Sequence, residues 1–196
     1  AQDAYAVAST TRAQAALRDG HFEWETTPVT VAGRQGDTVV QQDEQPPKAQ
    51  IDKIAQLKPA FAKDGTVTAA NASSISDGAA ALVLMRQSVA QAQGLTPLAV
   101  IRGHATHAQE PAWFTTAPVG AMRALLTRLN WTTQDVDLWE INEAFAVVTM
   151  AAMHELQLPH ERVNVHGGAC ALGHPIGASG ARILVTLLGA LRQRGL

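Results

Sequence analysis

The stretch GGACALGHPIG, residues 167–177, places a thiol and an imidazole among closely spaced glycines. Cys170 is the only cysteine of the chain, and His174 follows it four residues later. A Cys–His pair would suit nucleophilic catalysis, because an imidazole can activate a thiol. Cys170, however, lies among small apolar residues, which is typical of an inert, buried cysteine. We therefore interpret Cys170 as a packing residue and keep independent Cys170–His174 thiol chemistry as an alternative.

His174 is the stronger chemical candidate of the two. The neighbouring glycines let a substrate approach the backbone, and Pro175 fixes one turn of the loop. A helix is expected just downstream, and its N-terminus favours developing negative charge. The sequence therefore predicts that His174 takes a proton from a nucleophile or donates a hydrogen bond to an oxyanion. The other interpretation is a solvated loop histidine.

The segment WEINEAF, residues 139–145, places Asn142 and Glu143 between an apolar strand and an apolar helix. Asn is a favoured N-cap and Glu suits a first helical turn, so a helix cap is one interpretation. The other is that the Asn142 amide, which offers both donors and an acceptor, orients a catalytic water. A third segment, AANASS at residues 69–74, has the small side chains and hydroxyls that would admit a slender polar ligand, although an ordinary loop has the same composition.

The elements expected around these segments alternate between strand and helix. Helices are predicted at 1–19, 51–57, 86–93, 117–130, 143–156 and 181–196, and strands at 79–85, 97–106, 136–142 and 162–165, with a short hairpin around the turn at 33–37. The proline-marked segment 44–50 is predicted as a loop. The apolar run at 79–85 is expected to be buried on both faces of a sheet. This order predicts a layered α/β domain, in which ligands bind where strands end and helices begin. The three loops discussed above are therefore expected to lie together.

Composition excludes several classes of function. The chain has 46% hydrophobic and 16% charged residues, enough for a core, and its formal net charge of −2 with no basic block argues against a nucleic-acid partner. No apolar run is long enough for a membrane span, and no spacing of His, Cys and acidic residues suggests a metal site. A single cysteine fits a reducing compartment, so we expect a cytoplasmic location, although targeting cannot be judged from this N-terminus. Helical patterns that run to both ends predict a piece of a longer protein.

Three motifs together resemble the thiolases, the acetyl-CoA acetyltransferases and 3-ketoacyl-CoA thiolases. They are GTVTAANASSISDGAAALVL at 65–84, NEAFA at 142–146 and NVHGGACALGHPIGASGAR at 164–182, and they occur in the family's order and spacing. The resemblance implies the thiolase-like layered αβαβα fold. It further implies that residues 1–75 belong to the loop domain that covers coenzyme A and helps assembly, that 76–96 close the N-terminal half, and that 97–196 form most of the C-terminal half.

The resemblance also assigns roles to individual residues. His174 matches the histidine that activates the nucleophilic thiol and supports the thioester oxygen, and Asn142 matches the asparagine that holds a water in the same oxyanion hole. Glu143 is expected to be structural. The positions that contact or line the path of the pantetheine arm of coenzyme A are matched by Ser73, Ala69, Ala144 and Phe145. Coenzyme A and acyl-CoA are implied as substrates, with no tightly bound cofactor, and the full-length protein is expected to be a homo-oligomer, a dimer or tetramer.

The chain departs from the family pattern in its cysteines. The family's nucleophilic cysteine is expected upstream of residue 1 and its second reactive cysteine downstream of residue 196, whereas Cys170 takes the place of a small apolar residue. The resemblance therefore implies thiolytic cleavage of a 3-ketoacyl-CoA, or the reverse Claisen condensation, through an acyl-cysteine that this chain does not supply. We expect the isolated chain to be inactive, and the alternative function is a CoA-binding or assembly module without catalysis. The unusual segment EPAWFTTAPVG at 110–120 leaves the acyl-chain preference open.

Overall fold

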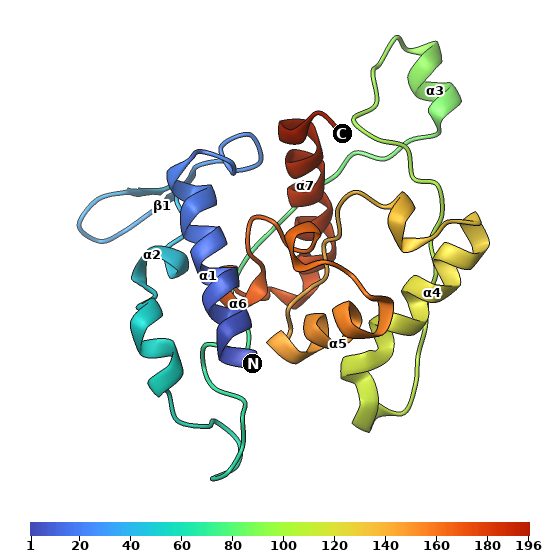
Figure 1. The fold of residues 1–196 in the computed structure, drawn as a ribbon. Coiled ribbons are helices and arrows are strands. Elements are labelled where there is room, and N and C mark those ends of the chain that lie inside the picture. Colours follow the sequence, from blue (N-terminus) through green and yellow to red (C-terminus); the bar gives the residue numbers. More distant parts are fainter.

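A computed structural model describes residues 1–196 and shows a mixed α/β chain dominated by helices (Figure 1). The α-helices are α1 Gln2–Arg18, α2 Gln45–Lys48, α3 Gln87–Ala92, α4 Ala117–Leu129, α5 Ala146–Leu156, α6 Ala169–Leu172 and α7 Ile176–Arg194. The strands are β1 Val29–Val31 and β2 Thr38–Val40, and short 3₁₀-helices form at η1 Ile51–Gln56, η2 Pro111–Thr116, η3 Thr133–Asp135 and η4 His160–Arg162. No helix is both long and apolar enough to cross a bilayer.

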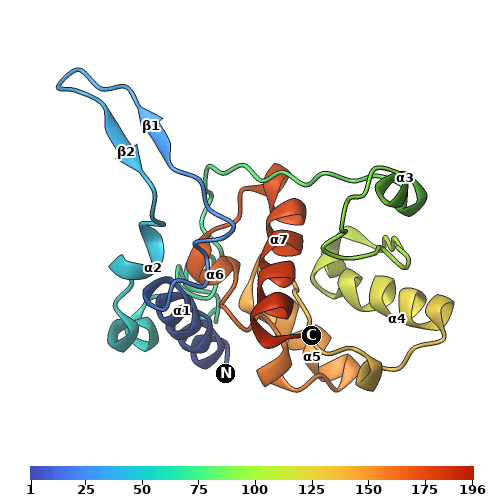
Figure 2. The same ribbon diagram turned by 90° about the horizontal axis from the view of Figure 1, so that it is seen from above.

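The helices pack in two groups that meet at α5. Helix α1 contacts α5, α6 and η1, while α4 contacts α5 and η2. Figure 1 shows α7 between α1 on one side and α4 on the other. Figure 2 shows the β1–β2 hairpin projecting from the body of the molecule. The site described below lies where α5, α6 and α7 begin.

Several predicted elements are confirmed. The chain forms α1 over the expected residues and stops before Gly20, whose φ of +74° suits a glycine. The antiparallel hairpin has Thr30 opposite Val39. Helix α4 has Pro118 in its first turn and ends at Leu129, and the next residue, Asn130, adopts the left-handed conformation of a helix cap.

Two local predictions were wrong. The segment 44–50 contains α2, because Pro46 and Pro47 occupy its first turn, where a missing N–H costs nothing. Helix α5 begins only at Ala146, with Phe145 as its N-cap residue, so the helix-cap interpretation of Asn142 does not hold. Asn142 and Glu143 instead lie in the turn that precedes the helix.

The predicted strands do not form ladders in this chain. The run at 79–85 was expected to be buried, but Val83 is 89% exposed. Ile101, in the next predicted strand, is 69% exposed. No strand of the chain pairs with either segment, since the only sheet is the two-stranded hairpin. A parallel strand requires neighbours on both sides and helices on both faces to become buried. The segments 136–142 and 162–165 meet through a single parallel bridge between Trp139 and Val163.

The buried core is small and lies around α5. One cluster consists of Val119, Ile141, Ala152, Leu156, Leu158 and Val163 and joins α4 to α5. The other consists of Tyr5, Ala146 and Cys170 and joins α1, α5 and α6. The second cluster fixes the starts of α5 and α6 against α1, and these starts carry the candidate site.

Candidate functional site

The structure brings the three predicted loops together. The His174 N–H donates to the Ser74 carbonyl at 3.1 Å, which joins the glycine loop at 167–177 to the segment at 69–74. The Ser73 N–H donates to the Ala144 carbonyl at 3.1 Å, which joins the same segment to the turn before α5. Residues as far apart in sequence as Ser73 and His174 therefore belong to one site.

The ring of His174 is oriented by Ser179, in the first turns of α7. His174 Nδ1 lies 2.6 Å from Ser179 Oγ, and that hydroxyl donates to the Pro175 carbonyl at 3.0 Å. Since the Ser179 proton is used there, its oxygen accepts from Nδ1–H, and the neutral ring carries its lone pair on Nε2. This is the tautomer in which Nε2 acts as a base. Ser179 was not among the predicted site residues, because the last helix was expected at 181–196 and α7 begins at Ile176. The signal that could have found it is a hydroxyl five residues after the histidine.

Asn142 lies beside this ring. Its Nδ2 is 3.3 Å from His174 Nε2 and 3.4 Å from Nδ1, so the amide sits between the two ring nitrogens. In the tautomer that Ser179 imposes, only Nε2 can accept from Asn142. Asn142 Oδ1 is buried and has no hydrogen-bond partner in the chain. This orphaned acceptor is suited to a hydrogen bond from a water or from a ligand.

Three of the four residues expected to contact coenzyme A lie together. Ser73 donates from its hydroxyl to the Ala144 carbonyl at 2.9 Å, and Ala72 forms an antiparallel bridge with Phe145. Ala69 is exposed on the same loop and makes none of these contacts.

Phe145 is flanked by two aromatic rings that the sequence analysis missed. Its centroid lies 6.4 Å from that of Phe61 and 6.3 Å from that of Phe114, both in edge-to-face geometry. Phe61 is 76% exposed and Phe114 is 52% exposed, so this cluster presents an apolar face next to the turn that carries Asn142. Phe114 belongs to the unusual segment at 110–120.

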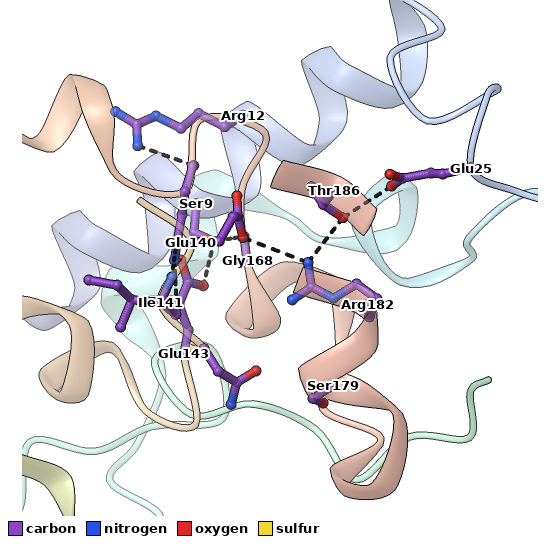
Figure 3. A network of polar contacts seen from close by, with 12 residues as sticks. Ser9, Arg12, Glu25, Glu140, Ile141, Glu143, Gly168, Ser179, Arg182 and Thr186 are labelled. Atoms are coloured by element: carbon purple, nitrogen blue, oxygen red, sulfur yellow. Dashed lines mark hydrogen bonds and ion pairs between the residues drawn. The ribbon is translucent and has the colours of Figure 1, made fainter. Parts of the chain in front are cut away.

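Glu143 is fully buried and accepts four hydrogen bonds. Figure 3 draws its side chain together with that of Ser9, one of the donors. The donors are the Tyr5 hydroxyl at 2.8 Å, the Ser9 hydroxyl at 2.7 Å, Asn164 Nδ2 at 2.8 Å and the Cys170 N–H at 3.0 Å. These bonds join three parts of the chain to the turn that precedes α5: helix α1, the segment that follows η4, and the start of α6. Neither lysine nor arginine is among the partners.

Cys170 is buried in the cluster with Tyr5 and Ala146. Desolvation raises the pKa of its thiol, and the neighbouring Glu143 raises it further. Its sulfur lies 4.0 Å from the Glu143 carbonyl oxygen, whereas the ring nitrogens of His174 contact Asn142 and Ser179. This arrangement supports the interpretation of Cys170 as a packing residue and gives no support to a Cys170–His174 dyad.

A second polar cluster of Glu25, Glu140, Arg182 and Thr186 lies nearby (Figure 3). Arg182 Nη1 is 4.0 Å from Glu140 Oε2, too far for a hydrogen bond, while Thr186 donates to Glu25 Oε1 at 3.1 Å. Desolvation by burial raises the pKa of Glu140 to about 8 and that of Glu25 to about 7, although Arg182 opposes both shifts.

Two clefts border the start of α7. One of about 430 Å³ lies between residues 76–80 and 175–178, and a larger one of about 820 Å³ extends past Arg182 toward the hairpin. Neither Asn142 nor His174 lines them. No group of three or more His, Cys, Asp or Glu side chains is arranged to hold a metal ion.

Comparison with known proteins gives one consistent result. The model of the thiolase C-terminal domain matches residues 95–196, and that of the thiolase N-terminal domain matches residues 1–88. The acetyl-CoA acetyltransferase of Chromobacterium violaceum is 49% identical over 196 residues, which cover 99% of this chain and 50% of the relative.

Solved structures agree with the sequence matches. The crystal structure of the Bacillus anthracis acetyl-CoA acetyltransferase superposes with a TM-score of 0.96 at 45% identity, covering 100% of this chain and 50% of that one. An Ascaris suum thiolase in complex with coenzyme A gives a TM-score of 0.87 at 43% identity, covering 97% of this chain and 49% of that one. The chain thus spans about half the length of the relatives it matches.

Proposed function

The chain belongs to the thiolase family and has its fold, and from this premise we propose that it supplies the thioester-binding part of an acyl-CoA C-acyltransferase. The reaction is thiolytic cleavage of a 3-ketoacyl-CoA or the reverse Claisen condensation of two acyl-CoA molecules. The observation that supports it most is the Asn142–His174 pair, in which the Nε2 lone pair of the imidazole faces the Asn142 amide at 3.3 Å and the buried Oδ1 of that amide has no partner.

His174 acts first as a base in this proposal. Its Nε2 accepts the proton of the attacking thiol while the sulfur bonds to the carbonyl carbon of the thioester. Negative charge then develops on the carbonyl oxygen, where the protonated ring and a water held by Asn142 donate hydrogen bonds. Removal of one such donor typically costs about 10²–10³ in rate. When this intermediate collapses, the carbonyl re-forms and the bond between the carbonyl carbon and the coenzyme A sulfur breaks. The proton on His174 Nε2 passes to that sulfur, and coenzyme A leaves as the thiol. Ser179 holds Nδ1 protonated throughout, so the ring exchanges its proton at Nε2 alone.

The attacking thiol comes from polypeptide outside residues 1–196. Cys170 is the only cysteine of the chain, and it is buried with a raised pKa. We therefore expect no turnover by the isolated chain in a coupled assay that follows the release or consumption of free coenzyme A. Turnover by this chain alone, at a rate that scales with its concentration, would contradict the proposal.

Coenzyme A binds as a substrate along Ser73, Ala144 and Phe145, with Ala69 farther along the same loop. The hydrogen-bonded contact of Ser73 with Ala144 and the exposed aromatic face around Phe145 support this path. In titration calorimetry, Ser73→Trp is expected to abolish the heat of coenzyme A binding by filling the path. Ser88→Trp, at an exposed position of α3, serves as the control. Equal heats for both variants would remove this assignment.

The alternative function is a CoA-binding or assembly module without catalysis, and the buried Cys170 favours it for the chain taken alone. Coenzyme A binding with no turnover fits this alternative.

We also propose that the full-length protein is homo-oligomeric and cytoplasmic, and that the chain divides at residues 75 and 96 as the resemblance implies. The change from one matched domain to the other between residues 88 and 95 supports the division near residue 96, and the free thiol of Cys170 is compatible with a reducing compartment.

A further inference from the structure

We propose that Glu143 is the positioning residue of the Asn142–His174 pair: its carboxylate holds the turn that carries Asn142 and the loop that leads to His174 at a fixed separation against α1. This inference rests on the proposed function of that pair. It is carried by the four hydrogen bonds that the buried carboxylate accepts from three separate parts of the chain.

The two carboxylate oxygens divide these donors evenly. Oε1 accepts from the Tyr5 hydroxyl and from Asn164 Nδ2, while Oε2 accepts from the Ser9 hydroxyl and from the Cys170 N–H. Tyr5 and Ser9 lie on α1, so the helix provides a donor to each oxygen. The side chain of Glu143 therefore cannot shift without breaking a bond on one side or the other.

Asn164 fixes the Asn142 side of the pair. Its Oδ1 accepts from the Ile141 N–H at 2.8 Å, and its Nδ2 donates to the Ile141 carbonyl at 2.8 Å as well as to Glu143. The side-chain amide thus bonds the backbone on one side of Asn142 and the carboxylate on the other. Because the amide uses all of these bonds in one orientation, it cannot flip without losing several of them.

The other oxygen fixes the His174 side. Glu143 Oε2 accepts from the Cys170 N–H. The Ser9 hydroxyl, which donates to Glu143, also accepts from the Gly168 N–H at 3.0 Å. Both amides belong to the first turn of α6. That short helix ends where the Gly173 N–H donates to the Ala169 carbonyl at 2.9 Å, immediately before His174. The imidazole therefore follows the anchored turn with little freedom.

A purely space-filling role does not explain this arrangement. Burial of a carboxylate carries a desolvation cost that an apolar side chain of similar volume avoids. Gly168 shows how closely the surroundings fit: a Cβ there would lie 2.3 Å from the Glu143 carboxyl carbon. The site requires acceptors on two sides at once, which a carboxylate provides.

Replacement by glutamine tests this requirement with almost no change of shape. The new Nε2 must face either Asn164 Nδ2 or the Cys170 N–H. The hydroxyls of Tyr5 and Ser9 can turn to accept, but these two N–H groups cannot. Glu143→Gln therefore breaks at least one of the two bonds that tie the pair together.

The experiment is nitrogen-15 NMR of the ligand-free chain in a Val83→Lys, Ile101→Lys background, which removes two exposed apolar side chains. The readouts are the His174 ring nitrogens across a pH titration, the Asn142 side-chain amide, and hydrogen exchange of the Cys170 amide and the Asn164 side-chain amide. Glu140→Gln is the matched control, because Glu140 is a buried carboxylate three residues earlier that bonds none of these groups. Ser9→Ala is the milder variant, which removes one donor and the bond to Gly168.

We expect Glu143→Gln to move the His174 and Asn142 resonances and to speed exchange of the Cys170 or the Asn164 amide at least tenfold. Ser9→Ala is expected to move the same resonances by less, and Glu140→Gln to leave them in place. Unchanged His174 and Asn142 resonances in Glu143→Gln, or equal changes in Glu140→Gln, would overturn the inference. If Glu143→Gln does not fold, Ser9→Ala provides the test: shifted His174 and Asn142 resonances support the inference, and unchanged resonances overturn it. No ligand is present, so a failure to bind coenzyme A would refute the proposed function and leave this result standing.

Discussion

The thiol of Cys170 and the imidazole of His174 are four residues apart and have different environments. The thiol packs against Tyr5 and Ala146, and desolvation followed by the charge of Glu143 raises its pKa. The titratable groups that face it are Tyr5 from α1 and Glu143 from the turn before α5. The ring of His174 is half-buried and is oriented by Ser179.

The difference predicts the reactivity of Cys170. We expect iodoacetamide at pH 8 to leave the folded chain unmodified and to alkylate Cys170 rapidly in guanidinium chloride, since only the exposed thiol forms thiolate. Mass spectrometry after timed quenching measures both rates. Alkylation of the folded chain at the unfolded rate would return Cys170 to the list of catalytic candidates.

Glu140 predicts a pH dependence of stability. Its pKa is raised from 4.5 to about 8, so the folded chain binds more protons than the unfolded chain between these values. Stability from this group is therefore complete at low pH and is lost as pH rises through about 8. Relative to wild type, Glu140→Gln should gain roughly 1–2 kcal/mol in the free energy of unfolding between pH 7 and pH 9. Urea unfolding at several pH values measures the difference, and a constant difference would contradict the assigned pKa.

The protonation of His166 does not interfere with this measurement. Desolvation and the neighbouring His21 lower the pKa of His166 to about 4, so it is neutral above pH 7 in the folded chain. In the unfolded chain, with a pKa of 6.5, it is mostly neutral at pH 7 and almost entirely neutral above pH 8. Its own effect is opposite in sign: stability rises as pH increases from about 4 to 6.5. The comparison at pH 7–9 therefore reports on Glu140.

At the scale of elements, α1, α6 and the turn before α5 meet where Gly168 packs closely against the Glu143 carboxylate. An added Cβ at Gly168 would meet the carboxyl carbon of Glu143 at 2.3 Å and one of its oxygens at 2.4 Å. We expect Gly168→Ala to lower the free energy of unfolding by roughly 1–3 kcal/mol, the usual cost of overpacking.

Gly180→Ala is the matched control for this substitution. Gly180 lies inside α7 with no atom within 4 Å of an added Cβ, so alanine should raise stability by about 0.5–1 kcal/mol through helix propensity. Thermal unfolding followed by circular dichroism distinguishes the two. A neutral effect of Gly168→Ala would show that α6 can move away from Glu143.

The sequence predicted the long helices and the hairpin because their signals are local. Periodic apolar residues, Gly20 and Pro118 mark the bounds of α1 and α4 without reference to the rest of the molecule. The motifs also predicted that Asn142 and His174 would meet. Ser179 and the aromatic partners of Phe145 were missed, because such contacts depend on how separate elements pack and no single segment encodes them.

The predicted strands failed for the same physical reason. The run at 79–85 has the composition of a buried strand, but burial depends on neighbours, and this chain provides none for it. Composition therefore predicted a buried strand at residues 79–85, and in this chain the segment forms no strand and is largely exposed.

At the scale of the whole molecule, the extended apolar segments 79–85 and 97–103 are exposed. Val83, Leu84, Leu98 and Ile101 are each between 66% and 89% exposed, and such unpaired apolar segments invite strand pairing with another chain. We expect the isolated chain to self-associate at micromolar concentration, and light scattering coupled to size exclusion measures this. Val83→Lys with Ile101→Lys should restore the monomer. A monodisperse wild-type monomer would contradict the expectation.

The measurement that tests the central claim most directly is a titration of the nitrogen-15-labelled chain with acetyl-CoA, in the Val83→Lys, Ile101→Lys background, with the His174 ring nitrogens and the Asn142 side-chain amide as reporters. The account predicts a saturable shift of both signals that persists in Cys170→Ala and is lost in Ser73→Trp. Absence of any shift at millimolar acetyl-CoA, or a shift that requires Cys170, would contradict it.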